Sequence, residues 1–183
     1  PICLIIPRAG SFFCLAEILT DLSLPADLPY PHDLCKNCTR CIDACPTGCI
    51  RPDRTIDANR CISYLTIENK SIIPDACKKS IGSWLIGCDV CQMVCPHNAT
   101  PIQQAAPAAE TILPESLELI SLFSLDADAF KVKFGESPLL RAKRTGLLRN
   151  AAVVLGNQKL TQALPVLRHA SQNDTDPGLK DAC

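Results

Sequence analysis

The sequence predicts an α+β chain of three parts: the end of an α/β domain, a cysteine-rich domain and an α-helical domain. Three observations predict this division. The chain opens on an apolar run of the kind found in a strand covered on both faces. Eight cysteines then recur with a repeated spacing between Cys35 and Cys95. Beyond residue 113, apolar residues return every three or four positions, which is typical of helices.

Residues 1–30 are expected to be the carboxyl-terminal tail of a domain whose other parts this chain does not contain. Residues 1–6 are the apolar run, and a buried strand of this kind needs neighbouring strands. Residues 11–20 place apolar side chains on one helical face, with Ser11 as the N-cap. That face comprises Phe12, Leu15, Ala16 and Leu19. Three prolines between residues 25 and 31 then predict an extended linker and a domain boundary near residue 30.

Residues 31–100 contain two copies of a cysteine run. The first copy is Cys35, Cys38, Cys41 and Cys45, followed by Pro46. The second is Cys61, which lies far upstream of its partners, then Cys88, Cys91 and Cys95, followed by Pro96. In two-cluster iron-sulfur proteins the first three cysteines of a run bind one cluster, and the cysteine before proline binds the other. The spacing therefore predicts two 4Fe-4S clusters in a ferredoxin-like domain, with crossed ligand sets.

The crossed sets are specific. Cluster one is expected to bind Cys35, Cys38, Cys41 and Cys95. Cluster two is expected to bind Cys45, Cys61, Cys88 and Cys91. Zinc sites present pairs of ligands rather than a triple followed by proline, and an odd total of 13 cysteines would leave one thiol out of a disulfide framework. The remaining five cysteines are expected to be small buried apolar residues: Cys3, Cys14, Cys49, Cys77 and Cys183.

Residues 101–113 are rich in alanine, glutamine and proline and predict a linker to a helical domain over residues 114–183. Apolar periodicity predicts helices over residues 115–123, 127–134, 139–155 and 160–171, and Pro177 begins a further short helix. Short turns between these helices favour antiparallel pairs of the HEAT-like repeat type.

Six basic residues lie between positions 131 and 149, against the single acid Glu136. They are Lys131, Lys133, Arg141, Lys143, Arg144 and Arg149. By composition alone, the segment fits a solvated helix face and a phosphate-binding surface equally well. The whole chain of 183 residues has a net charge of −1, which gives no general preference for nucleic acid, and it has no apolar run long enough to span a membrane. Cluster chemistry favours a reducing compartment, so a cytoplasmic protein is expected.

Four sequence segments together resemble the epoxyqueuosine reductase family. They are CTRCIDACPTG at residues 38–48, RCISYLTIE at 60–68, GCDVCQ at 87–92 and RAKRTGLLRNAA at 141–152. The cysteine runs alone occur in many proteins, whereas the Cys61 segment and the basic helix in this order are much more specific. The resemblance implies reduction of epoxyqueuosine to queuosine at the wobble position of tRNA.

The resemblance also implies cofactors, partners and site residues. Electrons would pass from an unidentified donor through cluster two and cluster one to cobalamin, and the protein would be a monomer. Residues that would line the cobalamin or the target base are Ser63, Cys88, Asp89, Val90 and Cys91. Residues that would contact tRNA are Lys70 and the six basic residues from Lys131 to Arg149. In the family, an amino-terminal half supplies most of the cobalamin pocket and the catalytic acid, so no catalytic residue is assigned and this segment alone is expected to be inactive.

Two other functions remain open at the level of sequence. One is a cobalamin enzyme related to reductive dehalogenases, which also join cobalamin to two such clusters. The other is a ferredoxin-type electron carrier whose helical tail docks a partner. The basic helical segment has no evident use in the first, and the second requires neither corrin nor tRNA.

Overall fold

The structure is a computed structural model that describes residues 4–13, 15–99 and 118–183. These residues are organised by helices and loops. Their β structure consists of two isolated bridges, which join Ile6 to Gly10 and Ile50 to Ile56. The β part of the predicted α+β class is therefore limited to these bridges in the described residues. The predicted linker over residues 101–113 lies outside them.

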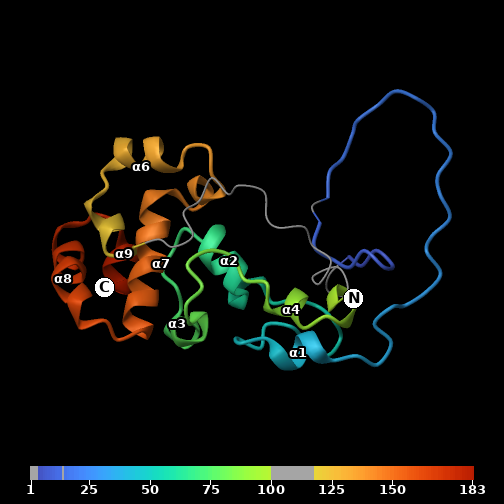
Figure 1. The fold of residues 1–183 in the computed structure, drawn as a ribbon, viewed down its shortest axis with the longest axis horizontal. Helices are drawn as coiled ribbons and strands as arrows, with labels where there is room; N and C mark the ends of the chain where they lie inside the picture. The colour runs from blue at the N-terminus through green and yellow to red at the C-terminus, as the bar shows by residue number, and fades with distance from the viewer. Residues whose placement is uncertain (1–3, 14, 100–117) are drawn as a thin grey trace.

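The cysteine-rich domain is a chain of short helices joined by loops (Figure 1). Its elements are α1 (Arg40–Ala44), η1 (Ala58–Arg60), α2 (Ile62–Ile67), α3 (Asp75–Ile81), α4 (Val90–Met93) and η2 (Pro96–Asn98). Helices α1 and α4 pack against each other, which brings the two cysteine runs together. Helices α2 and α3 pack against α7 of the helical domain.

The helical domain gathers at the other end of the molecule in Figure 1. Its elements are η3 (Ser121–Ser124), α6 (Ala127–Phe134), η4 (Pro138–Ala142), α7 (Lys143–Asn157), η5 (Thr161–Ala163), α8 (Leu164–Asn173) and α9 (Pro177–Ala182). The predicted helix over 127–134 and the helix begun by Pro177 are confirmed. The described part of the predicted helix over 115–123 is instead a turn followed by the 3-10 helix η3.

The predicted helix over residues 139–155 is divided in two. Residues 138–142 form the 3-10 helix η4, and the α-helix begins at Lys143. Lys143 has φ of 60°, which interrupts the right-handed helical path at this point. The predicted helix over 160–171 is likewise divided. Residues 161–163 form the 3-10 helix η5, and the α-helix α8 begins at Leu164.

Helix α7 is the centre of the core. Every residue from Gly146 to Leu155 is buried. Its apolar side chains join three neighbouring clusters, with Leu147 in the first, Val154 in the second and Leu155 in the third. A helix that is buried around its whole circumference needs partners on all sides, and α3, η4 and α9 supply them.

The first part of the chain differs from its prediction. Residues 11–13 and 15–20 contain no helix, and Leu19 is 95% exposed. A helix of ten residues is marginal by itself, and this apolar face has no surface to pack against in the described residues. Ser11 does not cap a helix; its backbone N–H donates to Asn98 Oδ1 at 2.6 Å and its hydroxyl to Gln92 Oε1 at 3.0 Å.

The predicted opening strand is also not a covered strand in its described part. Leu4 and Ile6 are 55% and 45% exposed, and Ile6 only closes a tight turn onto Gly10. The neighbours that such a strand needs are absent from the described residues. Residues 15–33 run as a wide loop away from both domains in Figure 1. None of the described helices is long and apolar enough to cross a lipid bilayer.

Candidate iron-sulfur centre and basic surface

The eight predicted ligands lie at the ends of short helices. In the first run, Cys35 and Cys38 precede α1, Cys41 is in α1 and Cys45 ends it. In the second, Cys61 precedes α2, Cys88 precedes α4, Cys91 is in α4 and Cys95 precedes η2. All eight are partly buried. The short helices therefore present sulfur atoms from tight loops.

Cysteines of both runs line two cavities. Cys35, Cys38, Cys41 and Cys95 line the first, together with His97, Ile5 and Leu34. Cys45, Cys61, Cys88 and Cys91 line the second, together with Cys49, Ile50, Ile56, Ile62 and Val90. Cys91 also borders the first cavity. Helices α1 and α4 pack against each other, so Cys95 lies with the first run and Cys45 with the second. The crossed ligand sets stay a prediction.

The donor chemistry fits iron-sulfur clusters. Thiolate is the soft ligand that iron-sulfur clusters take, and apolar side chains line both cavities. No group of three or more His, Cys, Asp and Glu in the described residues is arranged to hold a single metal ion. Cysteines from both runs line each of the two hollows.

The loop that carries the first ligands is held by Arg54. Its guanidinium pairs with Asp33 at 3.0 Å and also donates to the carbonyl of Lys36. Asp33 in turn accepts from the backbone N–H of Cys35 at 2.9 Å. The hydrogen bond from Arg54 holds the pKa of Asp33 below its ordinary value, so the carboxylate is ionised at neutral pH.

The loop after α1 brings two further side chains to Cys45. Thr47 Oγ1 lies 3.6 Å and Cys49 Sγ lies 3.4 Å from Cys45 Sγ. Burial raises the pKa of Cys49 to about 12, so this thiol keeps its proton at neutral pH. Cys49 is buried, as predicted, but the cysteine spacing does not predict its contact with Cys45.

The second ligand loop is tied to α2. The backbone N–H of Gly87 donates to Thr66 Oγ1 at 2.9 Å, and Gly87 has φ of 70°, a conformation that favours glycine. Cys88 follows directly. The three predicted cobalamin-lining residues other than cysteines are close in sequence to ligands: Ser63 is half-buried on α2, Asp89 is exposed just before α4, and Val90 begins α4.

Arg149 does not lie on the predicted tRNA surface. It is 2% exposed, and its guanidinium donates to the carbonyls of Leu65, Asn69 and Ser71 at 2.7–2.8 Å. Asn150 Oδ1 accepts the remaining two N–H groups, at 2.9 and 3.2 Å. The prediction that Arg149 contacts RNA is therefore wrong for this structure, because all five of its donors are used inside the protein.

Arg149 and Asn150 form a buried clamp between α7 and the cysteine-rich part of the chain. The Asn150 side chain donates to the carbonyls of Thr66 and Leu85 at 2.7 and 3.0 Å. Helix α7 thereby holds the end of α2 and the segment before Cys88. Burial lowers the pKa of Arg149, but an arginine remains charged at any physiological pH.

Five of the predicted basic residues are exposed and come from adjoining elements; they form the basic surface. They are Lys70, Lys131, Lys133, Arg141 and Lys143. Lys70 Nζ donates to the carbonyl of Arg141 at 3.2 Å, and Arg141 Nε pairs with Glu68 at 2.6 Å. Helix α6, which carries Lys131 and Lys133, packs on η4 beside Arg141.

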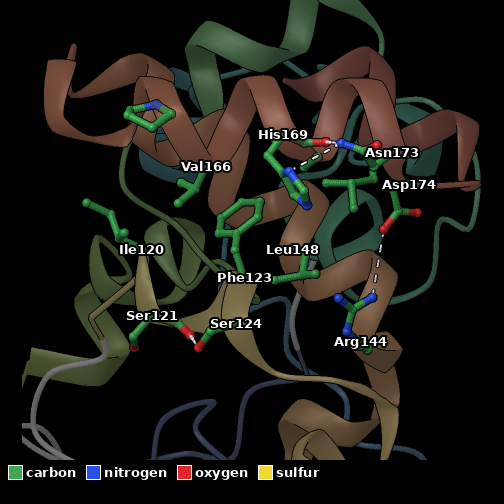
Figure 2. A pocket seen from close by; sticks show the side chains of 13 residues that line it. Ile120, Ser121, Phe123, Ser124, Arg144, Leu148, Val166, His169, Asn173 and Asp174 are labelled. Carbon is green, nitrogen blue, oxygen red and sulfur yellow. Dashed lines mark hydrogen bonds and ion pairs between the residues drawn. The ribbon is translucent and has the colours of Figure 1, made fainter.

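Arg144 belongs to a different site. Its Nε donates to the carbonyl of Leu125 at 2.6 Å, and its Nη1 lies 3.8 Å from Asp174. These contacts direct it into a 650 Å³ cavity between η3, α7 and α8, where Figure 2 shows it beside Asp174. None of the eight predicted ligands lines this cavity, which places it apart from the cysteine centre.

The cysteine-lined cavities are typical of an iron-sulfur protein, and they precede a run of helices. In agreement, the family described as a 4Fe-4S double cluster binding domain matches residues 34–98. The chain is 43% identical over 159 residues to an epoxyqueuosine reductase of Aliivibrio fischeri, covering 86% of this chain and 42% of that protein. It is 45% identical over 145 residues to one of Cyclobacterium marinum, covering 78% of this chain and 45% of that protein.

Solved structures give the same result. The epoxyqueuosine reductase of Bacillus subtilis matches with a TM-score of 0.85 at 35% identity, over 98% of this chain and 48% of that one. An epoxyqueuosine reductase crystallised with an epoxyqueuosine-modified tRNA stem loop matches with a TM-score of 0.84 at 33% identity. The match covers 98% of this chain and 48% of that one. Over the segment that it spans, the chain is similar to epoxyqueuosine reductases. It spans less than half the length of these relatives.

Proposed function

We propose that this segment carries electrons into the reduction of epoxyqueuosine to queuosine at the wobble position of tRNA. The observation that carries the proposal is the pair of cavities, because Cys95 lies with the first run at one cavity and Cys45 lies with the second run at the other. The names of the relatives support the substrate, and so does the tRNA stem loop in one matching structure.

The reaction consumes two electrons and two protons. Both C–O bonds of the epoxide break, a carbon–carbon double bond forms and the oxygen leaves as water. When bound, the two 4Fe-4S clusters supply single electrons and cobalamin supplies the two-electron reduction. The eight cysteines would hold the clusters, and apolar side chains line both cavities.

Cobalamin is proposed from the family resemblance, with Ser63, Asp89 and Val90 near its edge. These residues lie within two positions of Cys61, Cys88 and Cys91 and offer a hydroxyl, a carboxylate and an apolar side chain. Cys91 borders both cavities, so α4 lies between the proposed entry of electrons at cluster two and their exit from cluster one. The electron donor is proposed to be a separate one-electron carrier.

The basic surface is proposed to bind the phosphates of the tRNA stem. Lysine and arginine side chains that release counterions from phosphates supply most of the affinity of such contacts. The surface combines Lys70, which follows α2, with η4, α6 and the start of α7. We propose that these last three elements belong to a HEAT-like helical domain over residues 114–183. The protein is proposed to act as a cytoplasmic monomer, the tRNA being its macromolecular partner.

Anaerobic reconstitution of the full-length protein that contains this segment tests the function. The expected result is about eight irons per chain, a corrin absorption spectrum after addition of cobalamin, and conversion of epoxyqueuosine to queuosine in tRNA. Iron without corrin binding or tRNA turnover would instead favour the ferredoxin-type carrier. Corrin binding with dehalogenation and no tRNA turnover would favour the reductive dehalogenase relative.

A further inference from the structure

Cys45 differs from a simple cluster ligand because two buried side chains meet its sulfur. Thr47 Oγ1 and Cys49 Sγ lie 3.6 and 3.4 Å from Cys45 Sγ, within hydrogen-bond range for sulfur. Thr47 is 5% and Cys49 is 3% exposed, so water does not compete for either group. Cys49 belongs to neither crossed set of four.

The backbone fixes both side chains in place independently of the sulfur contact. The N–H of Gly48 donates to the carbonyl of Cys45 at 3.0 Å, and Gly48 has φ of 58°. Arg60 Nη2 donates to the carbonyl of Thr47 at 2.5 Å, and the N–H of Asp57 donates to the carbonyl of Cys49 at 2.8 Å. The loop is thus tied at three points and directs Thr47 and Cys49 toward the ligand.

The direction of these hydrogen bonds follows from the ligand's chemistry. A cysteine that binds iron is deprotonated, so its sulfur can only accept. The hydroxyl of Thr47 and the thiol of Cys49 must therefore be the donors whenever the cluster is bound. Hydrogen bonds to ligand sulfur favour the state with more negative charge, which is the reduced cluster.

We propose that Thr47 and Cys49 are positioning residues that donate hydrogen bonds to Cys45 and raise the reduction potential of cluster two. Under the proposed function, on which this step rests, cluster two receives electrons from the donor. A higher potential makes that first transfer more favourable and lets cluster two store an electron between single-electron steps. Neither residue needs to touch substrate or cobalamin.

A redox titration of the reconstituted full-length protein, followed by electron paramagnetic resonance without tRNA, tests this inference. The signal of cluster two is assigned by its loss in Cys61→Ala. Cys49→Ala and Thr47→Val are each expected to shift the midpoint of cluster two to a more negative potential, and the double variant to shift it further. Cluster one should keep its midpoint, and Cys183→Ala, a cysteine of the helical domain, should change neither.

Cys49→Ser separates a hydrogen bond from simple filling of space. Serine keeps a donor at this position, so its midpoint should lie nearer to the unmodified protein than that of Cys49→Ala. An unchanged or more positive midpoint in Cys49→Ala would overturn the inference. Loss of about four irons in that variant would overturn it as well, because Cys49 would then be a ligand. Because this measurement needs no substrate, it does not depend on whether the protein reduces epoxyqueuosine.

Discussion

Replacing Arg149 with methionine is expected to destabilise the protein by about 3–5 kcal/mol. Methionine keeps much of the side-chain length but removes five donors. The carbonyls of Leu65, Asn69 and Ser71 would then each lose a hydrogen-bond donor. The hydrogen bond to Leu65 is buried, and the other two are partly buried. Each buried acceptor left unpaired costs about 1–3 kcal/mol, so the lost hydrogen bonds outweigh any gain from burying a thioether.

Urea unfolding of the full-length protein, followed by helical circular dichroism, measures this effect. Arg149→Lys should recover little of the loss, because a lysine has three donors and cannot reproduce the planar fork. Arg168→Met is the matched control, since Arg168 is exposed on α8 and should change stability by no more than about 0.5 kcal/mol. An equally small effect at Arg149 would contradict the clamp between α7 and the cysteine-rich part of the chain.

Replacing Lys70, Arg141 and Lys143 together with alanine is expected to weaken tRNA binding by about 100-fold at 0.1 M salt. The three side chains are exposed on three adjoining elements of the basic surface. Each phosphate contact contributes close to one unit to the slope of log affinity against log salt concentration, so the slope should fall by about 2–3 units. Iron content should stay the same because none of the three is near a ligand in sequence.

Filter binding or fluorescence anisotropy across a salt series checks both quantities. The control variant replaces three exposed basic residues elsewhere in the helical domain, Lys159, Arg168 and Lys180. It removes the same charge, so a general electrostatic effect would act equally in both variants. If the two variants bind tRNA alike, the basic surface is not the tRNA site.

Much of the cysteine centre follows from sequence because its determinants are local. The spacing of each run fixes which three cysteines share a loop, and the proline after the fourth marks the residue that crosses over. The structure places Cys95 at a cavity with the first run and Cys45 at a cavity with the second run, and Cys91 lines both cavities. The helix over 127–134 could also be predicted from the sequence, because its apolar residues have helical spacing. In the structure Asp126 caps it.

The failures are positions where tertiary contacts decide the outcome. The face of residues 11–20 has helical periodicity, but periodicity stabilises a helix only when another surface covers it. Arg149 was predicted to lie on the tRNA surface with its basic neighbours, because charge patterning does not report whether a side chain is buried. Its burial had a signal in the sequence: Arg149 and Asn150 interrupt the apolar run of α7, and polar residues there need partners inside the protein.

The contact of Cys49 with Cys45 required the structure. Counting ligands completes both sets of four without Cys49, so sequence reasoning assigns it only a packing role. Its position depends on Gly48 at positive φ and on the carbonyl of Cys49 accepting from Asp57, eight residues along the chain. Spacing alone does not reveal this turn.

The crossed two-cluster centre is the central claim, and an iron count in paired cysteine variants tests it most directly. Cys35 and Cys95 share a cluster in the crossed arrangement, so replacing both with alanine should leave about four irons in the reconstituted full-length protein. Cys35 and Cys45 belong to different clusters, so replacing both should leave almost none. The reverse result, about four irons without Cys35 and Cys45 and almost none without Cys35 and Cys95, would show that each run binds its own cluster and would contradict the account.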